Sequence, residues 1–498
     1  MRAANRPPDS GGYDGRAMST FTIADGYFHR DGQRIWPVGA NYWPGSCGVE
    51  MWKQWPADEI RRDLDLLRSL GLNTLRFFLR WQDFEPAAGQ YDESTFAKLR
   101  QMLQWFAERD LWAHPSLFVG FMSGGVFWPA WRQNRNVFAD PFMVGCAAEF
   151  ARKAAAAIEP FRRHVLAVDQ GNELCCLADA ASAPPAAVAA WCRRINQSIR
   201  SAYPDALILC GNEQNQVIND TGWRLGAQEG CDLYSMHGYP VAAWHSVGFD
   251  GMTDPLAQSL LPLYVRIARA FGPVMLQEFG TIVTFGREPQ DAYLRGMLPA
   301  ALDAGANAFL WWCLRDITAA VHPYTRHGFE GTLGLVDAEG RVKPGLEYFI
   351  EFCRRLPDHK PPEPAPQAVG LYLPRHYYPR DNPFNNSNDP RQFSRSLVLA
   401  NYLLRSLGMP VRIVRGDQPI DPALRTLLVS GVLLSAEEAA DIEPWVKSGG
   451  RLLWQAPDPV NWGGAYTRLI GARPLDYRAP VPARFALFGR DWTLGEYP

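Results

Sequence analysis

Two short apolar runs in this chain each end in a glutamate, and these glutamates are the residues whose type and spacing suggest chemistry. The first run, VLAVDQGNEL, ends at Asn172 and Glu173, and the second, GPVMLQEFG, ends at Gln277 and Glu278. A β-strand that stops at an acid is typical of the mouth of a barrel, where strand ends deliver polar groups to a cleft. Two carboxylates that face each other across a cleft are the minimal equipment for cleaving a glycosidic bond.

The two acids can share one rim only if the chain between them folds as repeated strand and helix units. About three such units, roughly 30 to 35 residues each, fit between Glu173 and Glu278. One unit is visible near the start of the chain, where residues 57–70 have apolar positions at helical spacing, Gly71 ends the helix, and a strand follows at 73–79. This order is typical of a parallel sheet.

The unit recurs as far as residue 356, so we expect an α/β fold with a (β/α)₈ (TIM) barrel. The expected barrel strands are at 35–41, 73–79, 111–119, 165–170, 206–210, 233–237, 274–277 and 308–312. A small hairpin at 21–38 would close the bottom of the barrel. The loop at 120–140 is long and aromatic, and long loops at the carboxyl ends of barrel strands usually grip the substrate.

A proline-rich segment, HKPPEPAPQ, separates the barrel from the rest of the chain. Beyond it, strands at 369–373, 411–414, 427–432 and 451–454 alternate with helices at 394–407 and 436–447, which predicts a smaller doubly wound α/β domain. No cysteine follows Cys353, which excludes a cysteine-nucleophile amidotransferase. The expected domains are a disordered extension at 1–20, a catalytic barrel at 21–358, a linker at 359–367 and an α/β domain at 368–498.

The composition excludes several other classes of function. The 498 residues are too many for one ordinary core, and the 50 basic and 52 acidic residues are nearly balanced, so nothing attracts nucleic acid or an anionic membrane. Nine cysteines, an odd number without CxxC spacing, are typical of reduced thiols. The amino-terminal residues lack the apolar segment of a signal peptide, and no later window is long and apolar enough to span a bilayer. We expect a soluble, cytoplasmic protein.

Motifs at five strand ends agree, in order, with one known family. GNE at 171–173, QEFG at 277–280, HGY at 237–239, Arg76 on the second strand and Trp-x-x-x-Asp at 312–316 resemble the retaining glycoside hydrolases of clan A, most closely family 5. The resemblance covers residues 21 to 350. The segments ANYWP, LRWQDFEP and GLVDAEGRVKPG resemble the exo-acting β-mannosidase and β-galactosidase-like branches. The second domain resembles the degenerate amidotransferase-like domain of family 42 β-galactosidases, which helps subunits associate.

The resemblance implies roles for particular side chains. Glu173 would be the general acid/base, and Glu278 would be the nucleophile that forms a glycosyl ester. Asn172 would bind the 2-hydroxyl of the sugar, while Arg76 and Tyr239 would keep Glu278 ionised and aimed. The other residues expected at the site are two histidines on the floor, a tryptophan under the sugar and four contacts near the rim: His114, His237, Trp312, Asn41, Trp43, Trp128 and Glu330.

Several of these side chains have an ordinary structural alternative. Arg76 alone would more often be a buried ion-pair partner, and His114 fits the pocket and the core equally well. Trp311 and Trp312 point to opposite sides of a strand, and Trp312 is chosen because it begins the Trp-x-x-x-Asp pattern. Glu213, in GNEQN, is a decoy carboxylate or a sugar ligand.

The expected activity is that of a retaining exo-β-glycosidase acting on β-linked mannosides, because imported oligosaccharides enter the cytoplasm and polymers do not. The alternatives are an endo-β-1,4-mannanase, a β-glucosidase or β-galactosidase of the same clan, and a non-catalytic sugar-binding barrel, which the two glutamates disfavour. No metal or organic cofactor is implied, because the nine histidines lack zinc-ligand spacing and no glycine-rich phosphate loop occurs. The expected partner is an oligosaccharide, with neither nucleic acid nor membrane, and the second domain is a candidate surface for a homo-oligomer.

Overall fold

The computed structural model describes residues 21–214, 221–240, 252–281, 286–337, 339–360, 368–378, 390–432, 434–455, 468–469, 484–487 and 490–493. Two features expected from the sequence, the disordered extension at 1–20 and most of the linker at 359–367, lie outside these residues. In the described part of the chain, no helix combines the length and the hydrophobicity needed to cross a lipid bilayer.

Eight parallel strands form the predicted barrel, in the order β10–β9–β6–β5–β4–β13–β12–β11. They are β4 (Val38–Tyr42), β5 (Thr74–Phe78), β6 (Trp112–Phe118), β9 (Val168–Gly171), β10 (Ile208–Leu209), β11 (Tyr234–Gly238), β12 (Val274–Phe279) and β13 (Ala306–Trp311). Every pairing along this row is parallel, and a parallel bridge between Glu213 and His237 joins its two ends. The row therefore closes into a (β/α)₈ barrel.

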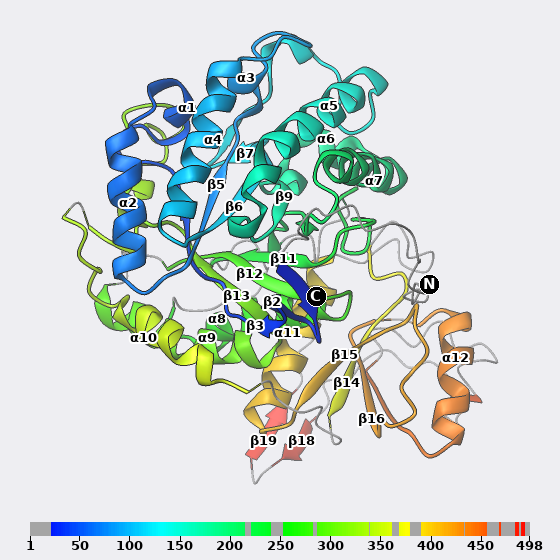
Figure 1. Cartoon of the computed structure of the whole chain (residues 1–498). Helices are drawn as coiled ribbons and strands as arrows, with labels where there is room; N and C mark the ends of the chain where they lie inside the picture. Colours follow the sequence, from blue (N-terminus) through cyan, green and yellow to red (C-terminus); the bar gives the residue numbers. More distant parts are fainter. Residues whose placement is uncertain are drawn as a thin grey trace.

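Helices surround the barrel (Figure 1). They are α1 (Met51–Gln54), α2 (Ala57–Ser69), α3 (Trp81–Phe84), α4 (Glu93–Glu108), α5 (Pro141–Ile158), α6 (Ala178–Ser182), α7 (Pro185–Ala202), α8 (Pro255–Arg269), α9 (Arg287–Asp303) and α10 (Glu347–Arg355). Three helices, α4, α5 and α8, begin directly after Asp92, Asp140 and Asp254, which cap them. Each cap accepts a hydrogen bond from a backbone N–H of the first turn, which apolar spacing does not reveal.

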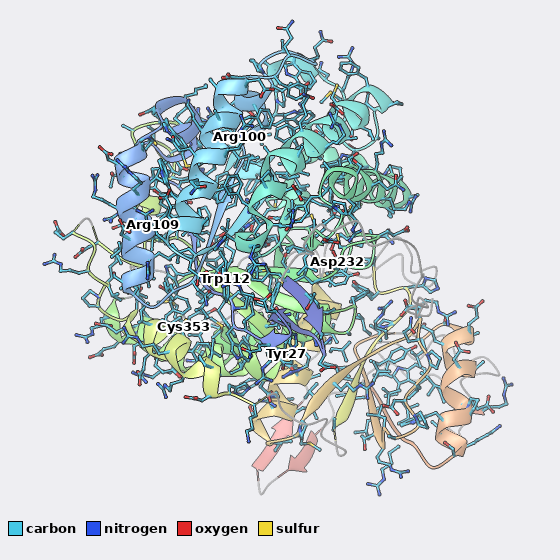
Figure 2. The ribbon with its side chains drawn as sticks, in the orientation of Figure 1. Tyr27, Arg100, Arg109, Trp112, Asp232 and Cys353 are labelled. Atoms are coloured by element: carbon cyan, nitrogen blue, oxygen red, sulfur yellow. The ribbon has the colours of Figure 1, made fainter. Side chains whose placement is uncertain are left out.

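Three short antiparallel strands close the end of the barrel away from the polar strand ends, as predicted. They are β1 (Phe21–Ala24), β2 (Tyr27–Arg30) and β3 (Gln33–Arg34). Phe21 and Phe28 pack with Trp112, Leu166 and Met275 in an apolar cluster at this end, where Figure 2 labels Trp112. With the bottom sealed by apolar contacts, the opposite end is left for a functional site.

The second domain has a four-stranded parallel sheet in the order β15–β14–β16–β17. Its elements are β14 (Val369–Leu373), α11 (Pro390–Ser406), β15 (Val411–Arg415), β16 (Thr426–Ser430), α12 (Ala436–Lys447) and β17 (Arg451–Gln455), followed by an unpredicted antiparallel pair, β18 (Arg484–Leu487) and β19 (Arg490–Thr493). Ser435 and Glu438 form a capping box at the start of α12. Alternating parallel strands and helices make this the predicted smaller α/β domain.

The two domains contact each other along α8, which lies beside α11 (Figure 1). Arg415, at the end of β15, donates to the carbonyl of Ala270, and its guanidinium lies 4.0 Å from the ring centroid of Phe271. Arg405 on α11 forms an ion pair with Asp303 at 3.0 Å. Cation–π and ionic contacts of this kind fix the second domain against the barrel.

Candidate active site

Arg76, on β5, is the centre of a buried network at the carboxyl ends of the barrel strands. Its guanidinium donates to Asp169 Oδ2 at 2.7 Å, Asn172 Oδ1 at 2.9 Å, Asn41 Oδ1 at 3.0 Å and Glu278 Oε2 at 3.1 Å. These partners lie on or directly after β9, β4 and β12. A planar guanidinium with a fixed fork of donors thereby ties the ends of four strands together.

Asp169 is the main member of this network that the sequence analysis missed. It is fully buried on β9, and its Oδ1 accepts hydrogen bonds from the backbone N–H groups of Gly171 at 3.1 Å and Gly211 at 2.9 Å. Its Oδ2 accepts from Gln277 Nε2 at 3.2 Å in addition to Arg76. The sequence contains a signal for this residue. Asp169 interrupts an apolar strand, and a buried acid needs a cationic partner.

Glu173 and Glu278 face each other above this network. One oxygen of each carboxyl group and a ring nitrogen of His237 lie within 4.8 Å of one another. His237 Nδ1 is 3.0 Å from Glu173 Oε1 and 3.6 Å from Glu278 Oε2, and all three side chains are buried. Carboxyl groups are about 5 to 5.5 Å apart in retaining glycosidases and roughly 6.5 to 9.5 Å apart in inverting ones. The observed arrangement fits the retaining geometry.

Glu278 is surrounded by groups that favour its ionised form. The hydroxyl of Tyr239 donates to Oε1 at 2.8 Å, and Arg76 donates to Oε2. A register shift between Met236 and His237 places His237 opposite Glu278 on the neighbouring strand. Burial raises the pKa of Glu278 to about 7 and the charge of Glu173 adds to this rise, while His237, Arg76 and Tyr239 oppose it. These donors suit a carboxylate that must act as a nucleophile.

Glu173 has different surroundings. Its backbone is in the left-handed region, with φ 46° and ψ 43°, which a residue with a side chain adopts rarely and which is common at functional sites. Burial raises the pKa of Glu173 to about 7, and the Arg76 guanidinium opposes this rise. Two neighbouring carboxyl groups with unlike surroundings can act as acid and nucleophile at the same pH.

Beneath the two glutamates, three side chains form a continuous hydrogen-bonded chain. His237 Nε2 is 2.8 Å from Gln277 Oε1, Gln277 Nε2 is 2.7 Å from His114 Nε2, and His114 Nδ1 is 2.8 Å from the carbonyl oxygen of Ala167. His114 is fully buried and both its nitrogens are used within this chain. It therefore supports the floor of the site.

The two asparagines expected to contact sugar are held by the protein itself. Asn41 is fully buried on β4, accepts a hydrogen bond from Arg76 and donates to the carbonyl of Gln277 at 3.0 Å. Asn172, next to Glu173, accepts from Arg76 and donates to the carbonyl of Phe121 at 2.8 Å. Asn41 thus lies inside the barrel, because it belongs to a strand and not to a rim loop.

Trp312 and Glu330 lie together at the end of β13. Trp312 Nε1 donates to Glu330 Oε2 at 3.0 Å, whereas Trp311 packs outward, 5.4 Å from Phe279 in an edge-to-face contact. Burial raises the pKa of Glu330, and the nearby charge of Glu173 raises it further. The strand alternation therefore places Trp312, rather than Trp311, on the side of Glu173.

The two other tryptophans expected at the rim are mainly packing residues. Trp43 is fully buried and stacks on Phe78, with ring centroids 5.3 Å apart. Trp128 is 9% exposed and meets Trp81 edge-on at 6.1 Å. Each has most of its aromatic surface covered by other rings, so little of it faces a ligand.

Two groups of side chains in the described residues bring three metal-binding atoms within 4.8 Å of one another. One is the Glu173, His237 and Glu278 group already described. The other is formed by Cys175, Cys176 and Glu213, with the two sulfurs 3.9 Å apart. Glu213 thus lies beside the thiols that follow Glu173, and Glu278 is the acid that faces Glu173.

Comparison with solved structures gives one strong similarity. The exo-β-1,4-mannosidase Op5Man5 from Opitutaceae bacterium strain TAV5 is 51% identical to this chain, with a TM-score of 0.90. The alignment covers 95% of this chain and 86% of the other. Neither a protein-family model nor a curated protein matches the chain.

More distant structures share the fold. A GH5_18 protein from Streptomyces cattleya, solved in complex with GlcNAc, is 22% identical with a TM-score of 0.69, over 85% of this chain and 99% of its own. A β-galactosidase from the Antarctic haloarchaeon Halorubrum lacusprofundi is 15% identical with a TM-score of 0.62, over 87% of this chain and 76% of its own. These two likenesses concern the arrangement of the domains and not the chemistry.

Proposed function

Because the chain belongs to family 5 of the clan A glycoside hydrolases, together with an exo-β-1,4-mannosidase to which it is 51% identical, we propose that it is a retaining exo-β-mannosidase acting on short β-linked mannosides. The observation that carries this proposal is the pair of buried glutamates, which bring one oxygen of each carboxyl group within 4.8 Å of the other. An inverting enzyme would need room for a water molecule between them.

In the first step, Glu278 is the nucleophile and Glu173 is the acid. A Glu278 oxygen forms a bond to the anomeric carbon while the bond from that carbon to the leaving oxygen breaks. The leaving oxygen takes a proton from Glu173. Arg76 and Tyr239 hold Glu278 by hydrogen bonds of 3.1 and 2.8 Å, which keep it ionised and aimed before the sugar arrives.

In the second step, the same residues exchange roles. Glu173, now a carboxylate, takes a proton from water while the water oxygen bonds to the anomeric carbon and the ester to Glu278 breaks. The product keeps the β configuration because the anomeric carbon is inverted twice. A carboxyl group with a pKa near 7 suits this cycle, since it must release and recover one proton in each turnover.

A loop contact supports removal of one sugar at a time. The hairpin of β7 (Phe121–Met122) and β8 (Gly125–Val126) follows β6 and is anchored to Asn172 through the carbonyl of Phe121. Its tip meets the loop after β13 so closely that a Cβ on Gly124 would lie 2.3 Å from His327 Nε2. We propose that this contact forms a wall near Trp312 and Glu330 that stops a longer sugar chain from continuing.

We assign the sugar at the cleavage point to the surface between this wall and Glu278. Trp312 would stack under the ring, and Glu330 would accept hydrogen bonds from its hydroxyl groups, since a buried carboxylate beside an indole is a typical sugar contact. Asn172, next to Glu173, would bind the 2-hydroxyl of the sugar. The preference for mannose over glucose or galactose rests on the 51% identical relative.

The first experiment measures chromophore release from aryl β-mannoside, β-glucoside and β-galactoside. We expect a strong preference for the β-mannoside in the wild type. Glu278→Gln and Glu173→Gln should each lower kcat/KM on the order of 10³-fold or more, because the amide is neither a nucleophile nor an acid. Proton NMR of the first product should show β-mannose, as retention requires.

Glu85→Gln is a matched control for the two glutamine variants. Glu85 is also fully buried, but its carboxylate is bonded to Trp81 and Gly89 outside the site. We expect this variant to lose stability and to keep its preference for the β-mannoside. Unchanged turnover in Glu278→Gln, or α-mannose as the first product, would contradict the proposed mechanism.

Two further properties belong to this proposal. All nine cysteines are free thiols, which supports a reducing compartment and hence the cytoplasm. We also propose a homo-oligomer formed through the second domain, because Leu399, Leu403 and Leu407 make an exposed apolar stripe along α11 and the end that follows it. The stripe lies on another face of α11 from Arg405, which pairs with the barrel.

A further inference from the structure

The hydrogen-bonded chain under the active site has a direction that its two fixed ends determine. At one end, His114 Nδ1 is 2.8 Å from the carbonyl oxygen of Ala167, which can only accept. In the middle of the chain, Gln277 Nε2 is 2.7 Å from His114 Nε2, and it is also 3.2 Å from Asp169 Oδ2, which fixes the amide from outside the chain. Asp169 is the ion-pair partner of Arg76 and receives two backbone N–H groups, so it also only accepts.

These acceptors assign each proton in turn. Because the Ala167 carbonyl accepts, His114 carries its proton on Nδ1, and its Nε2 is left as an acceptor for the Gln277 amide N–H. Because the amide nitrogen of Gln277 faces two acceptors, its oxygen must face His237. The Gln277 oxygen, in turn, accepts a proton from His237 Nε2 at 2.8 Å.

The last link reaches the acid. With its proton on Nε2, a neutral His237 presents a bare Nδ1 to Glu173 Oε1 at 3.0 Å. Burial lowers the pKa of His237, and Arg76 lowers it further, which favours the neutral ring. A bare nitrogen can hydrogen-bond a carboxyl group only if the carboxyl group holds the proton.

We propose that Ala167, His114, Gln277 and His237 form a relay that keeps Glu173 protonated in the resting enzyme, with Gln277 and His114 as positioning residues. This inference rests on the proposed function for its kinetic consequence and on geometry alone for its proton assignment. The two histidines hold opposite tautomers, His114 protonated on Nδ1 and His237 on Nε2.

The relay also favours the second half of the reaction. When Glu173 has given its proton to the leaving oxygen, its carboxylate faces a lone pair on His237 Nδ1 and has lost a hydrogen bond. The carboxylate recovers that bond only by taking a proton, which the attacking water supplies as its oxygen bonds to the anomeric carbon. A donor at this position would instead stabilise the carboxylate and slow this step.

Other charged and titratable groups also act on Glu173 and His237, from every element packed around them. They are Arg76 on β5, Asp169 on β9, Cys175 and Cys176 after β9, Glu213 after β10, Tyr239 after β11, Glu278 on β12 and Glu330 after β13. One of them, Asp169, also accepts a hydrogen bond from Gln277 Nε2. His114 bonds to the Ala167 carbonyl and to Gln277, so His114→Phe tests the relay without removing a hydrogen bond to Asp169.

Two substitutions of Gln277 should move the pH profile differently. Gln277→Met removes the acceptor for His237 Nε2, so the ring can place its proton on Nδ1 and donate to an ionised Glu173. The basic limb of kcat/KM should then move to lower pH by about one unit. Gln277→Glu keeps an acceptor opposite His237, so its basic limb should stay in place or move to higher pH.

His114→Phe should shift the basic limb in the same direction as Gln277→Met but by a smaller amount, because Asp169 still orients the Gln277 amide.

Gln170→Met is the matched control. Gln170 is a fully buried glutamine on β9 whose amide bonds to Asn196, outside the relay. It should lose stability as Gln277→Met does, without any shift of the basic limb. An unmoved limb in a folded Gln277→Met enzyme, or equal shifts in Gln277→Met and Gln277→Glu, would overturn the relay.

Histidine ¹⁵N spectra of the wild type test the proton assignment without activity. We expect a neutral His237 protonated on Nε2 and a neutral His114 protonated on Nδ1 at pH 6. A His237 protonated on Nδ1 would refute the relay even in an active enzyme. If the expected tautomers are found in a protein that hydrolyses no aryl glycoside, the proposed function fails and the relay stands.

Discussion

At the scale of single residues, one contact pattern separates two chemically identical glutamates. Glu278 receives donors from Arg76 and Tyr239, while Glu173 faces His237. Arg76 can donate to Glu278 without leaving an excess of positive charge in the site, because Asp169 forms an ion pair with its guanidinium at 2.7 Å. A buried pair of this kind contributes specificity of placement more than stability.

This difference predicts an asymmetric pH profile. In the proposed mechanism Glu173 is the acid and must be protonated, and burial raises its pKa to about 7. The value of kcat/KM on aryl β-mannoside should therefore fall as the pH rises through about 7. On the acidic side, activity should fall when Glu278 gains a proton. Tyr239→Phe removes a hydrogen bond to the ionised form of Glu278, so its acidic limb should move to higher pH.

Initial rates between pH 4 and 9 would measure both limbs. The matched change Tyr293→Phe alters a buried tyrosine outside the site and should leave both limbs in place. A basic limb well above pH 9, or an acidic limb that moves down in Tyr239→Phe, would contradict the assignment of the two glutamates.

At the scale of elements, the hairpin between β6 and α5 connects Asn172, next to Glu173, to the loop after β13. Asn172 holds its first strand, and its tip at Gly124 touches His327. Gly124 has φ +77° and leaves no space for a side chain, so both its backbone and its contact depend on glycine. The hairpin is the element on which exo action depends in this proposal.

Gly124→Ala should therefore open the pocket. The added Cβ would force the hairpin away from His327. Because the sugar would then be held less well, kcat/KM on aryl β-mannoside should fall about 10-fold. The variant should also release some mannobiose directly from aryl β-mannobioside. Gly89→Ala is the control, since Gly89 has φ +75° and no atom within 4 Å of the added Cβ. It should lose about 1 kcal/mol of stability with mannose still the first product. Chromatography of early products distinguishes the two; mannose alone from Gly124→Ala would show that the hairpin does not limit chain length.

At the scale of the whole molecule, the second domain joins the barrel through Arg415 and α11. Its apolar stripe on α11 faces away from that contact, with Leu403 59% and Leu407 74% exposed. Exposure of this extent in consecutive turns of a helix is typical of a surface that another subunit covers.

Leu403→Glu with Leu407→Glu should convert an oligomer to a monomer in light scattering, because two charges would be buried in the interface. Leu453→Glu is the control, since Leu453 on β17 has a similar exposure of 56% and lies outside the stripe. Aryl mannosidase activity should persist in all three proteins. A wild type that is monomeric at micromolar concentration would refute the proposed assembly.

The sequence by itself determined the fold class and the identity of the two glutamates as the residues to examine. Strand and helix periods repeat locally, so eight strands, most helices and the second domain could be read within a few residues. The strand-end motifs carry Glu173, Glu278, Arg76, His237 and Tyr239, since parallel strands bring their carboxyl ends to one rim.

Only the tertiary structure decided which side chains meet. Asp169, Gln277 and the orientation of His114 depend on contacts between residues 53 to 163 positions apart, for which no local period exists. Asn41, Trp43 and Trp128 are matched by type to sugar contacts, yet the structure uses them mainly in packing and in bracing Arg76. The proposed protonation of Glu173 also depends on the tertiary structure, because it follows from a hydrogen-bonded chain of residues on different strands.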